Sequence, residues 1–118
     1  MILHCFVTFI TVDDAVVILE DTIQVTENEA NFTWRIDGNP YNIKYFEIFL
    51  TDLSDAEGNL SCMTREDSST TSLDQTDCGK NLKSNTNYTV TVMPFYFDGE
   101  KAIGAQVEIT TNPGDYSF

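Results

Sequence analysis

Carboxylates are the side chains best suited to chemistry in this sequence, which holds 19 Asp and Glu residues among 118. Two close pairs are Asp52 with Asp55 and Asp74 with Asp77. Such a pair acts as acid and base only in a concave, partly desolvated site that separates its two pKa values. A nucleophilic triad also needs a base, and the single histidine, His4, lies in an N-terminal segment open to removal by processing. We therefore predict no catalytic residues and no enzyme activity.

Metal binding is a second use of carboxylates, and the turn "DLSDAEGN" at 52–59 gathers several oxygen donors. Calcium prefers such ligands, but its loops place acids at alternating positions and close with a glutamate, a spacing that this turn does not match. A solvated hairpin turn is the favoured interpretation. Structural zinc is also disfavoured, since no Cys-x-x-Cys pair occurs and His4 is alone. We predict no metal site and no cofactor.

Three cysteines, Cys5, Cys62 and Cys78, define the redox chemistry of the chain. Cys5 lies in an apolar N-terminal run, whereas a polar, Ser/Thr-rich segment separates the other two. A disulfide between Cys62 and Cys78 would close a loop of about 15 residues and stabilise the fold by roughly 3 kcal/mol. The alternative is a pair of free thiols. We predict the disulfide.

Three sequences match the acceptor motif for N-linked glycans, at Asn31, Asn59 and Asn87. Asn31 falls on the outward face of a predicted strand and the other two fall in predicted turns, so all three side chains are expected to reach solvent. Their use depends on entry into the secretory pathway. The alternative is that they are unmodified asparagines at positions that favour this residue.

The balance of charge limits the partners of the chain. Six Lys and Arg against 19 Asp and Glu give a net charge of −13. This sign repels phosphates, so we predict no binding to nucleic acid or to anionic membrane surfaces. The acids are dispersed between apolar segments, which indicates a solvated surface that keeps the domain soluble. A basic partner is the alternative use of the same charge.

The N-terminal segment 1–15 opens with an apolar run, "MILHCFVTFITV". The run is shorter than the roughly 20 residues that a membrane-spanning helix needs. A signal peptide is one interpretation, although no basic residue precedes the run and "DDA" is a poor cleavage site. An additional ordered strand and an error in the gene boundary are the others. Removal of the segment would leave the even pair Cys62 and Cys78.

Short alternating apolar segments separated by turn residues recur along the rest of the chain, and helical periodicity is hard to find. This pattern indicates an all-β domain. We predict seven strands, within 15–26, 29–36, 44–52, 60–64, 69–76, 87–96 and 105–111. They would form a seven-stranded antiparallel β-sandwich of the immunoglobulin-like class over residues 16–111. Residues 112–118 would be a linker or tail.

Alternation also predicts which side chains point into the sandwich. Trp34 points inward from the second predicted strand. In the third strand, one register would bury Glu47, whose unpaired charge would cost several kcal/mol. The favoured register instead buries three apolar side chains, Phe46, Ile48 and Leu50. It leaves Tyr45 and Phe49 on the outer face.

Together these elements resemble a fibronectin type III domain. Trp34 ends the second predicted strand, and "LKSNTNY" places Leu82 and Tyr88 at the spacing of the family's L-x5-Y corner. The resemblance covers about residues 16–111. It implies that Trp34, Leu82 and Tyr88 belong to the core, with the Tyr88 hydroxyl bonded to backbone in the corner loop.

Two features depart from the family pattern. The segment from Ser61 to Asn81 is more polar and contains the cysteine pair, which a typical member lacks. Pro94 lies within the sixth predicted strand, where the missing N–H should end the regular ladder or mark a bulge. An immunoglobulin domain fits less well, because no cysteine lies in the second strand or two positions after Tyr88.

Exposed aromatic side chains offer a binding surface. Tyr45 and Phe49, with Tyr96 and Phe97 beside the last turn, are predicted to form a patch on the outer face of one sheet. The alternative is that these side chains only stabilise the sheet as cross-strand pairs. Neither Arg-Gly-Asp nor Trp-Ser-x-Trp-Ser occurs, so two recognition sequences associated with the family are missing.

The resemblance implies an extracellular protein–protein interaction module, in a secreted protein or in the ectodomain of an adhesion protein or receptor. Its partner would be a protein, neighbouring domains are expected, and the domain itself would not span a membrane. Two alternatives are a structural spacer in a multidomain ectodomain and a stand-alone secreted surface antigen.

Overall fold

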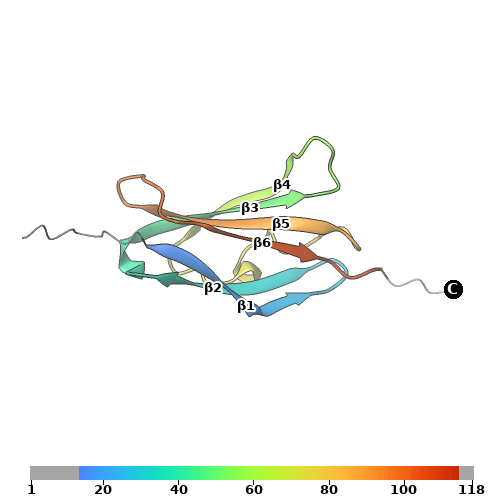
Figure 1. Cartoon of the computed structure of the whole chain (residues 1–118), viewed down its shortest axis with the longest axis horizontal. Coiled ribbons are helices and arrows are strands. Elements are labelled where there is room, and N and C mark those ends of the chain that lie inside the picture. Colours follow the sequence, from blue (N-terminus) through green and yellow to red (C-terminus); the bar gives the residue numbers. More distant parts are fainter. Residues whose placement is uncertain (1–13, 115–118) are drawn as a thin grey trace, which may run out of the picture.

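A computed structural model describes residues 14–114, and the segments 1–13 and 115–118 lie outside this range. His4, Cys5 and nearly all of the predicted signal peptide therefore fall outside the described residues. Within them the chain forms six strands and two short 3-10 helices: β1 (Ala15–Val25), β2 (Ala30–Asp37), η1 (Pro40–Asn42), β3 (Ile43–Asp52), β4 (Leu60–Asp67), η2 (Leu73–Gln75), β5 (Asn87–Tyr96) and β6 (Ala105–Thr110). Antiparallel pairing gives a two-stranded sheet, β1-β2, and a four-stranded sheet, β4-β3-β5-β6. The sheets are the two layers of a sandwich (Figure 1).

Apolar side chains from both sheets meet between the layers. They alternate with more exposed neighbours along β2, β3 and β5, as the sequence pattern predicts. Trp34 lies at the centre, with ring centroids 5.9 Å from Phe32 and 5.8 Å from Phe46. Tilted and edge-on contacts of this kind are the ones that aromatic rings favour. Since Phe46 belongs to β3, Trp34 joins the smaller sheet to the larger one.

The prediction of seven strands is wrong, because the described chain has six and lacks the strand expected within 69–76. An isolated bridge between Ser72 and Thr33 marks the place of that strand. Its polar composition explains the difference, since local side-chain hydrogen bonds compete with a strand ladder. The Gln75 side chain accepts from the N–H groups of Thr71 (2.8 Å) and Ser72 (3.2 Å), and these bonds fix the turn of η2.

The crossover segment, residues 68–86 between β4 and β5, still follows the edge of β2 and the turn before it. Backbone bonds of 2.8–2.9 Å make this connection: Trp34 N–H to Thr71 O, Ala30 N–H to Gly79 O, and Leu82 N–H to Asn28 O. Gly79 permits a close approach, since a Cβ at this position would lie 2.5 Å from the carbonyl oxygen of Ala30. The crossover segment therefore stands in for a third strand of the smaller sheet.

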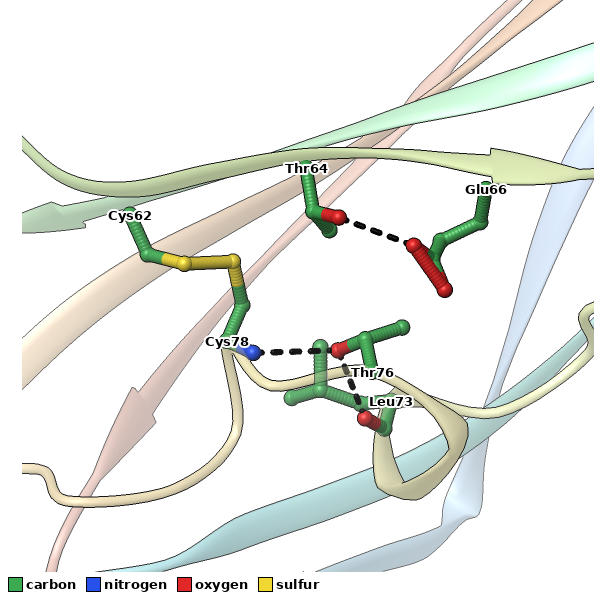
Figure 2. Close-up of a disulfide and its surroundings, with 6 residues drawn as sticks. All are labelled: Cys62, Thr64, Glu66, Leu73, Thr76 and Cys78. Carbon is green, nitrogen blue, oxygen red and sulfur yellow. Dashed lines mark hydrogen bonds between the residues drawn. A yellow bond between two sulfur atoms is a disulfide. The ribbon is translucent and has the colours of Figure 1, made fainter.

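A disulfide between Cys62 and Cys78 fastens the crossover segment to β4, which confirms the predicted pairing. Figure 2 shows the bridge running from β4 to the coil that follows η2. There the Cys78 N–H donates to Thr76 Oγ1 (3.2 Å), and this hydroxyl donates to the carbonyl of Leu73 (2.8 Å). Because the crossover segment also bonds to β2, the disulfide links the two sheets along one side.

Pro94 is buried inside β5, opposite Phe46 of β3. The ladder between β5 and β6 ends before it, at the pair of Val92 with Ala105. The Pro94 carbonyl instead accepts from the N–H of Ala102 in the β5–β6 hairpin (3.0 Å). Pro94 thus lies where the regular ladder with β6 has ended, as its missing N–H predicts.

The described chain enters at one end of the sandwich and leaves at the other (Figure 1). At the entrance, Asp14 accepts from the N–H of Asn39 in the turn between β2 and β3 (2.7 Å). At the exit, Gly114 lies near Ser84 of the corner loop and Glu27 of the β1–β2 turn. Across residues 14–114, no helix has the length and apolar character needed to cross a bilayer.

Candidate functional site on the outer face of the four-stranded sheet

Three rows of side chains cross the outer face of the four-stranded sheet. Because β3 buries alternate residues, its outward positions are Tyr45, Glu47 and Phe49. Their cross-strand partners in β4 are Asp67, Arg65 and Met63. Their partners in β5 are Phe95, Met93 and Thr91. The pairing register therefore collects aromatic and thioether side chains on one surface.

The row through Phe49 makes an apolar centre on this face. Phe49 is half-buried, and its partner Met63 is 61% exposed. A flexible, polarisable thioether beside an aromatic ring adapts well to a second protein surface. Covering Met63 would remove apolar surface from water, so this pair offers a contact point to a partner.

Beside the apolar centre lies Arg65, whose guanidinium is fixed by contacts with Tyr45 and Glu47. Its guanidinium carbon lies 4.3 Å from the centroid of the Tyr45 ring, and its Nη2 lies 2.8 Å from Glu47 Oε1. The bond to Glu47 raises the pKa of Arg65 above its ordinary value. Tyr45 in turn stacks on Phe95, with centroids 4.8 Å apart and planes 17° apart. Sequence reasoning missed Met63 and Arg65. Met63 lies within the strand predicted at 60–64, whereas Arg65 lies just beyond it, in the part of β4 that the prediction left out.

The structure separates the four aromatic residues predicted to form one patch. Tyr45 and Phe49 lie on the outer face. Tyr96 instead packs against the hydrophobic core, and its hydroxyl accepts from the Asp14 N–H (3.0 Å). Phe97 is 66% exposed in the turn between β5 and β6. Two of the four residues therefore belong to the candidate site.

The corner before β5 buries both Leu82 and Tyr88. The Tyr88 hydroxyl accepts from the backbone N–H of Lys83 at 2.8 Å. The same lysine places Nζ 3.0 Å from Oδ2 of Asp52, the residue opposite Tyr88 in the β3–β5 ladder. The corner thus ties the start of β5 to the end of β3.

Asp52 is buried rather than solvated, contrary to the expectation for the turn 52–59. Its Oδ1 accepts from the hydroxyl (2.6 Å) and the N–H (2.8 Å) of Ser54. The hydroxyl bond is the main cause that lowers the pKa of the Asp52 carboxyl, and Lys83 adds to it. Among residues 14–114, no group of three or more His, Cys, Asp or Glu is arranged to hold a metal ion.

Asp14 is a second acid that the sequence pattern assigned to the surface and the structure buries. It accepts from the N–H of Asn39 (2.7 Å) and from Nδ2 of Asn42 (3.1 Å), and these bonds, the first above all, lower its pKa. Gly38 makes room for the carboxylate. Its φ is +128°, and a Cβ there would lie 2.0 Å from Asp14 Oδ1.

Comparison with known proteins tests the resemblance at the level of fold. No family model and no curated protein matches the sequence. Among solved structures, the FN1–FN3 domains of chicken contactin-1 (CNTN1) are similar, with a TM-score of 0.62 over 83% of this chain at 16% identity. The fold is that of a fibronectin type III domain. The chain spans about a third of the contactin-1 structure, with 32% of it covered.

The three sequon asparagines have different settings on this fibronectin type III-like domain. Asn59 and Asn87 are exposed. Asn31 is half-buried on the outward face of β2, and its Oδ1 accepts from the N–H of Asp74 in η2 (2.8 Å). The three asparagine side chains therefore differ in their exposure to solvent and in their hydrogen bonds.

Hollows flank the crossover segment of the fibronectin type III-like sandwich. One, of about 250 Å³, lies between the β1–β2 sheet and η2, with Asn31 in its wall. Another, of about 290 Å³, lies beside the Cys62–Cys78 disulfide and Tyr88. Neither hollow is lined by Tyr45, Phe49, Met63 or Arg65 of the outer face.

Proposed function

We propose that this chain is an extracellular, non-catalytic protein–protein interaction module that binds its partner through the outer face of the four-stranded sheet. The observation that carries this proposal is the combination of exposed Met63 with Phe49, Tyr45 and Arg65 on that face. Aromatic, Met and Arg side chains are enriched in protein interfaces. Arg65 is already oriented by Glu47, so less side-chain freedom is lost when a partner binds.

Two further features support an extracellular setting. Disulfides such as Cys62–Cys78 persist in oxidising compartments and are rare in the cytosol. The similar contactin-1 structure contains several FN domains in series. We therefore propose that residues 16–111 form one domain, with 112–118 as a linker, among neighbouring domains of a secreted protein or a receptor or adhesion ectodomain.

The charge of the chain favours a partner of a particular kind. A net charge of −13 attracts basic protein surfaces and repels acidic ones at long range. Such steering increases the rate of association more than the final affinity. The expected partner is a protein with an apolar contact strip bordered by Lys or Arg.

Binding measurements on matched variants test the outer face. The domain, multimerised on a carrier, is screened against a panel of receptor and adhesion ectodomains, and the affinity of any partner is then measured. Met63→Glu and Phe49→Ser should each weaken binding by at least about tenfold, because they disrupt the apolar centre. Tyr41→Glu changes a side chain that is 89% exposed in η1, and it should leave binding unchanged. Full affinity in Met63→Glu would reject the outer face as the binding surface.

A structural spacer is the second candidate, favoured by the entrance and exit of the chain at opposite ends of the sandwich (Figure 1). Such an arrangement suits domains joined in series. Replacement of this domain in its parent protein by an unrelated fibronectin type III domain of equal length separates the candidates. A spacer keeps the activity of the parent protein after the exchange, whereas an interaction module loses it.

A further inference from the structure

We propose that Asn31 carries an N-linked glycan whose first sugar is seated in the hollow between the β1–β2 sheet and the crossover segment. The proposal rests on the extracellular placement argued above, since glycans of this type are added to secreted chains. It goes further by selecting one of three sequons and by assigning the hollow to a carbohydrate.

The Asn31 amide is already oriented for such a linkage. Its Oδ1 accepts from the Asp74 N–H at 2.8 Å, which holds the planar amide against η2. Its Nδ2, the atom that bonds to a sugar, donates no hydrogen bond within residues 14–114. Nor is Nδ2 among the buried, unpaired side-chain atoms of this range. Solvent therefore reaches Nδ2 while the rest of the amide is fixed.

The hollow has the size and chemistry for a single sugar ring. Its volume of about 250 Å³ is below the roughly 300–1,000 Å³ of pockets that hold drug-sized ligands. Its wall offers donors and acceptors from Gln24, Thr26, Glu29, Asp74 and Lys80. Such groups suit the hydroxyls and the acetamido group of N-acetylglucosamine. Gln24 is the direct cross-strand partner of Asn31, so its amide is well positioned beside the first ring.

Irregularities of the fold create this hollow. The β1–β2 ladder shifts register between Leu19 and Gln24, which interrupts the sheet beside Asn31. The crossover segment leaves the edge of β2 after Ser72 and returns at Gly79. A regular third strand would have filled this space. The proposed interaction surface lies on the other sheet, so a glycan in the hollow would leave it open.

The other sequons provide matched controls. Asn59 is exposed and its Nδ2 donates to Glu57 (3.0 Å), whereas Asn87 is exposed and its Oδ1 accepts from Thr110 (2.5 Å). Neither asparagine lines either of the two hollows. A sugar at these positions would extend into solvent.

The modification forms one bond and breaks one. C1 of an oligosaccharide carried on a lipid pyrophosphate bonds to Nδ2 of Asn31. The bond from C1 to the pyrophosphate oxygen breaks, and its electron pair leaves with the lipid pyrophosphate. Nδ2 gives up one proton to a base of the transferase, and no atom is oxidised or reduced.

Expression of the Asn59→Gln/Asn87→Gln variant in a secretory host isolates Asn31. Mass spectrometry of the peptides measures its occupancy, and an endoglycosidase trims the glycan to one N-acetylglucosamine. Amide hydrogen exchange at Asp74, Gly79 and Lys80 is then compared with that of the same variant made without glycan. We expect exchange at these amides to slow by at least about threefold when the sugar is seated. Gln24→Ala, which removes the neighbouring amide, should reduce this protection.

Trimmed wild-type protein supplies the control. Where Asn59 or Asn87 carries a sugar, the neighbouring amides should exchange at the same rates as in protein made without glycan. An unmodified Asn31 beside an occupied Asn59 or Asn87 overturns the proposal and leaves the extracellular placement standing. If Asn31 carries a glycan but exchange around the hollow is unchanged, the first sugar does not lie in the hollow and that part of the proposal is overturned. Secreted protein without glycan at any sequon overturns the proposal and also counts against the extracellular placement.

Discussion

The hydroxyl oxygen of Tyr88 connects the core to the corner loop through a hydrogen bond. The Tyr88 ring is buried between the sheets, and its hydroxyl accepts from the Lys83 N–H at 2.8 Å. The ring contributes apolar burial, whereas the hydroxyl satisfies a backbone donor that would otherwise lose its partner. A phenylalanine at this position separates the two contributions, because it keeps the ring and deletes the oxygen.

Tyr88→Phe should lower the free energy of unfolding by about 1 kcal/mol, the usual contribution of such a hydrogen bond. Urea denaturation of the variant and of wild type measures the difference. Tyr41→Phe is the control, since this side chain is 89% exposed and its hydroxyl should contribute little. A loss well under 0.5 kcal/mol in Tyr88→Phe would contradict the role of the hydroxyl in the corner.

Asp52→Asn tests the buried carboxylate through the pH dependence of stability. The bonds from Ser54, followed by Lys83, lower the pKa of Asp52 in the folded chain. A depressed pKa means that the carboxylate stabilises the fold above the ordinary Asp value of about 3.9, and that this contribution is lost as the pH falls below it. Wild type should therefore be more stable than the variant at pH 7, with the difference shrinking below about pH 4. A difference that is independent of pH would contradict this account.

At the residue scale, sequence predicts what depends on local spacing and misses what depends on distant partners. The Leu82 and Tyr88 positions follow from a short motif. The Asp14 carboxylate depends on Asn39 and Asn42, which lie 25 and 28 positions away. Asp52 combines a local bond from Ser54 with an ion pair to Lys83, 31 positions away. No local pattern distinguishes these two acids from their solvated neighbours.

Among the elements, the crossover segment is where the sequence pattern and the structure differ most. A strand is predicted within its residues 69–76, but Gln75 and Thr76 bond to the backbone of their own turn instead. The edge of β2 is still covered, through separate contacts at Thr71 and Gly79. In a strand with one apolar face, burial of that face fixes the register. A polar segment lacks this constraint, so local side-chain hydrogen bonds to the backbone compete with the strand ladder.

Gly79→Ala should disturb the contact between the crossover segment and β2 at Ala30. Its Cβ would meet the Ala30 carbonyl oxygen at 2.5 Å, so the backbone must shift and weaken the Ala30 N–H bond. We expect a loss of about 1–3 kcal/mol in the free energy of unfolding, as for other overpacked positions. Gly114→Ala is the matched control, since its nearest neighbour would lie at 3.5 Å. Equal stability of the two variants would contradict a tight contact at Gly79.

The double variant Cys62→Ala/Cys78→Ala should lose roughly 3 kcal/mol, because the disulfide no longer restricts the unfolded chain. Urea denaturation measures this loss, and both cysteines are changed so that no free thiol is left. Hydrogen exchange should quicken most in the crossover segment, which the disulfide fastens to β4. Uniform quickening across the sandwich, with no excess in this segment, would contradict a local fastening role.

For the whole molecule, the strongest property readable from the sequence is its net charge of −13. Repulsion among the acids favours expansion of the chain, and salt screens charges separated by more than about 10 Å at 0.1 M. The all-β architecture was also predictable, since alternation recurs along most of the chain. The outer face was predictable in part, because Tyr45 and Phe49 followed from β3 alone, whereas Met63 and Arg65 required the register with β4.

Added salt should therefore stabilise the domain. Raising NaCl from about 20 mM to about 300 mM should increase the urea midpoint by a few tenths of a molar, since repulsion outweighs the exposed ion pairs. Glu20→Gln/Asp21→Asn removes two adjacent exposed acids of β1. This variant should be more stable than wild type at low salt and should respond less to added salt. A lower midpoint at high salt would indicate that ion pairs dominate instead.

The position of the disulfide also decides how the domain would behave under tension. A pull applied at Asp14 and Gly114 acts along the length of the sandwich, since the chain enters and leaves at opposite ends (Figure 1). The Cys62–Cys78 bridge, with its sequence separation of 16, keeps that loop out of the stretched contour. At roughly 3.3–3.6 Å per residue, this loop adds about 50 Å to the contour length of the unfolded chain only after the disulfide is reduced. Single-molecule stretching before and after reduction would measure this difference in contour length. The length to which the unfolded domain extends would then depend on the redox state of its surroundings.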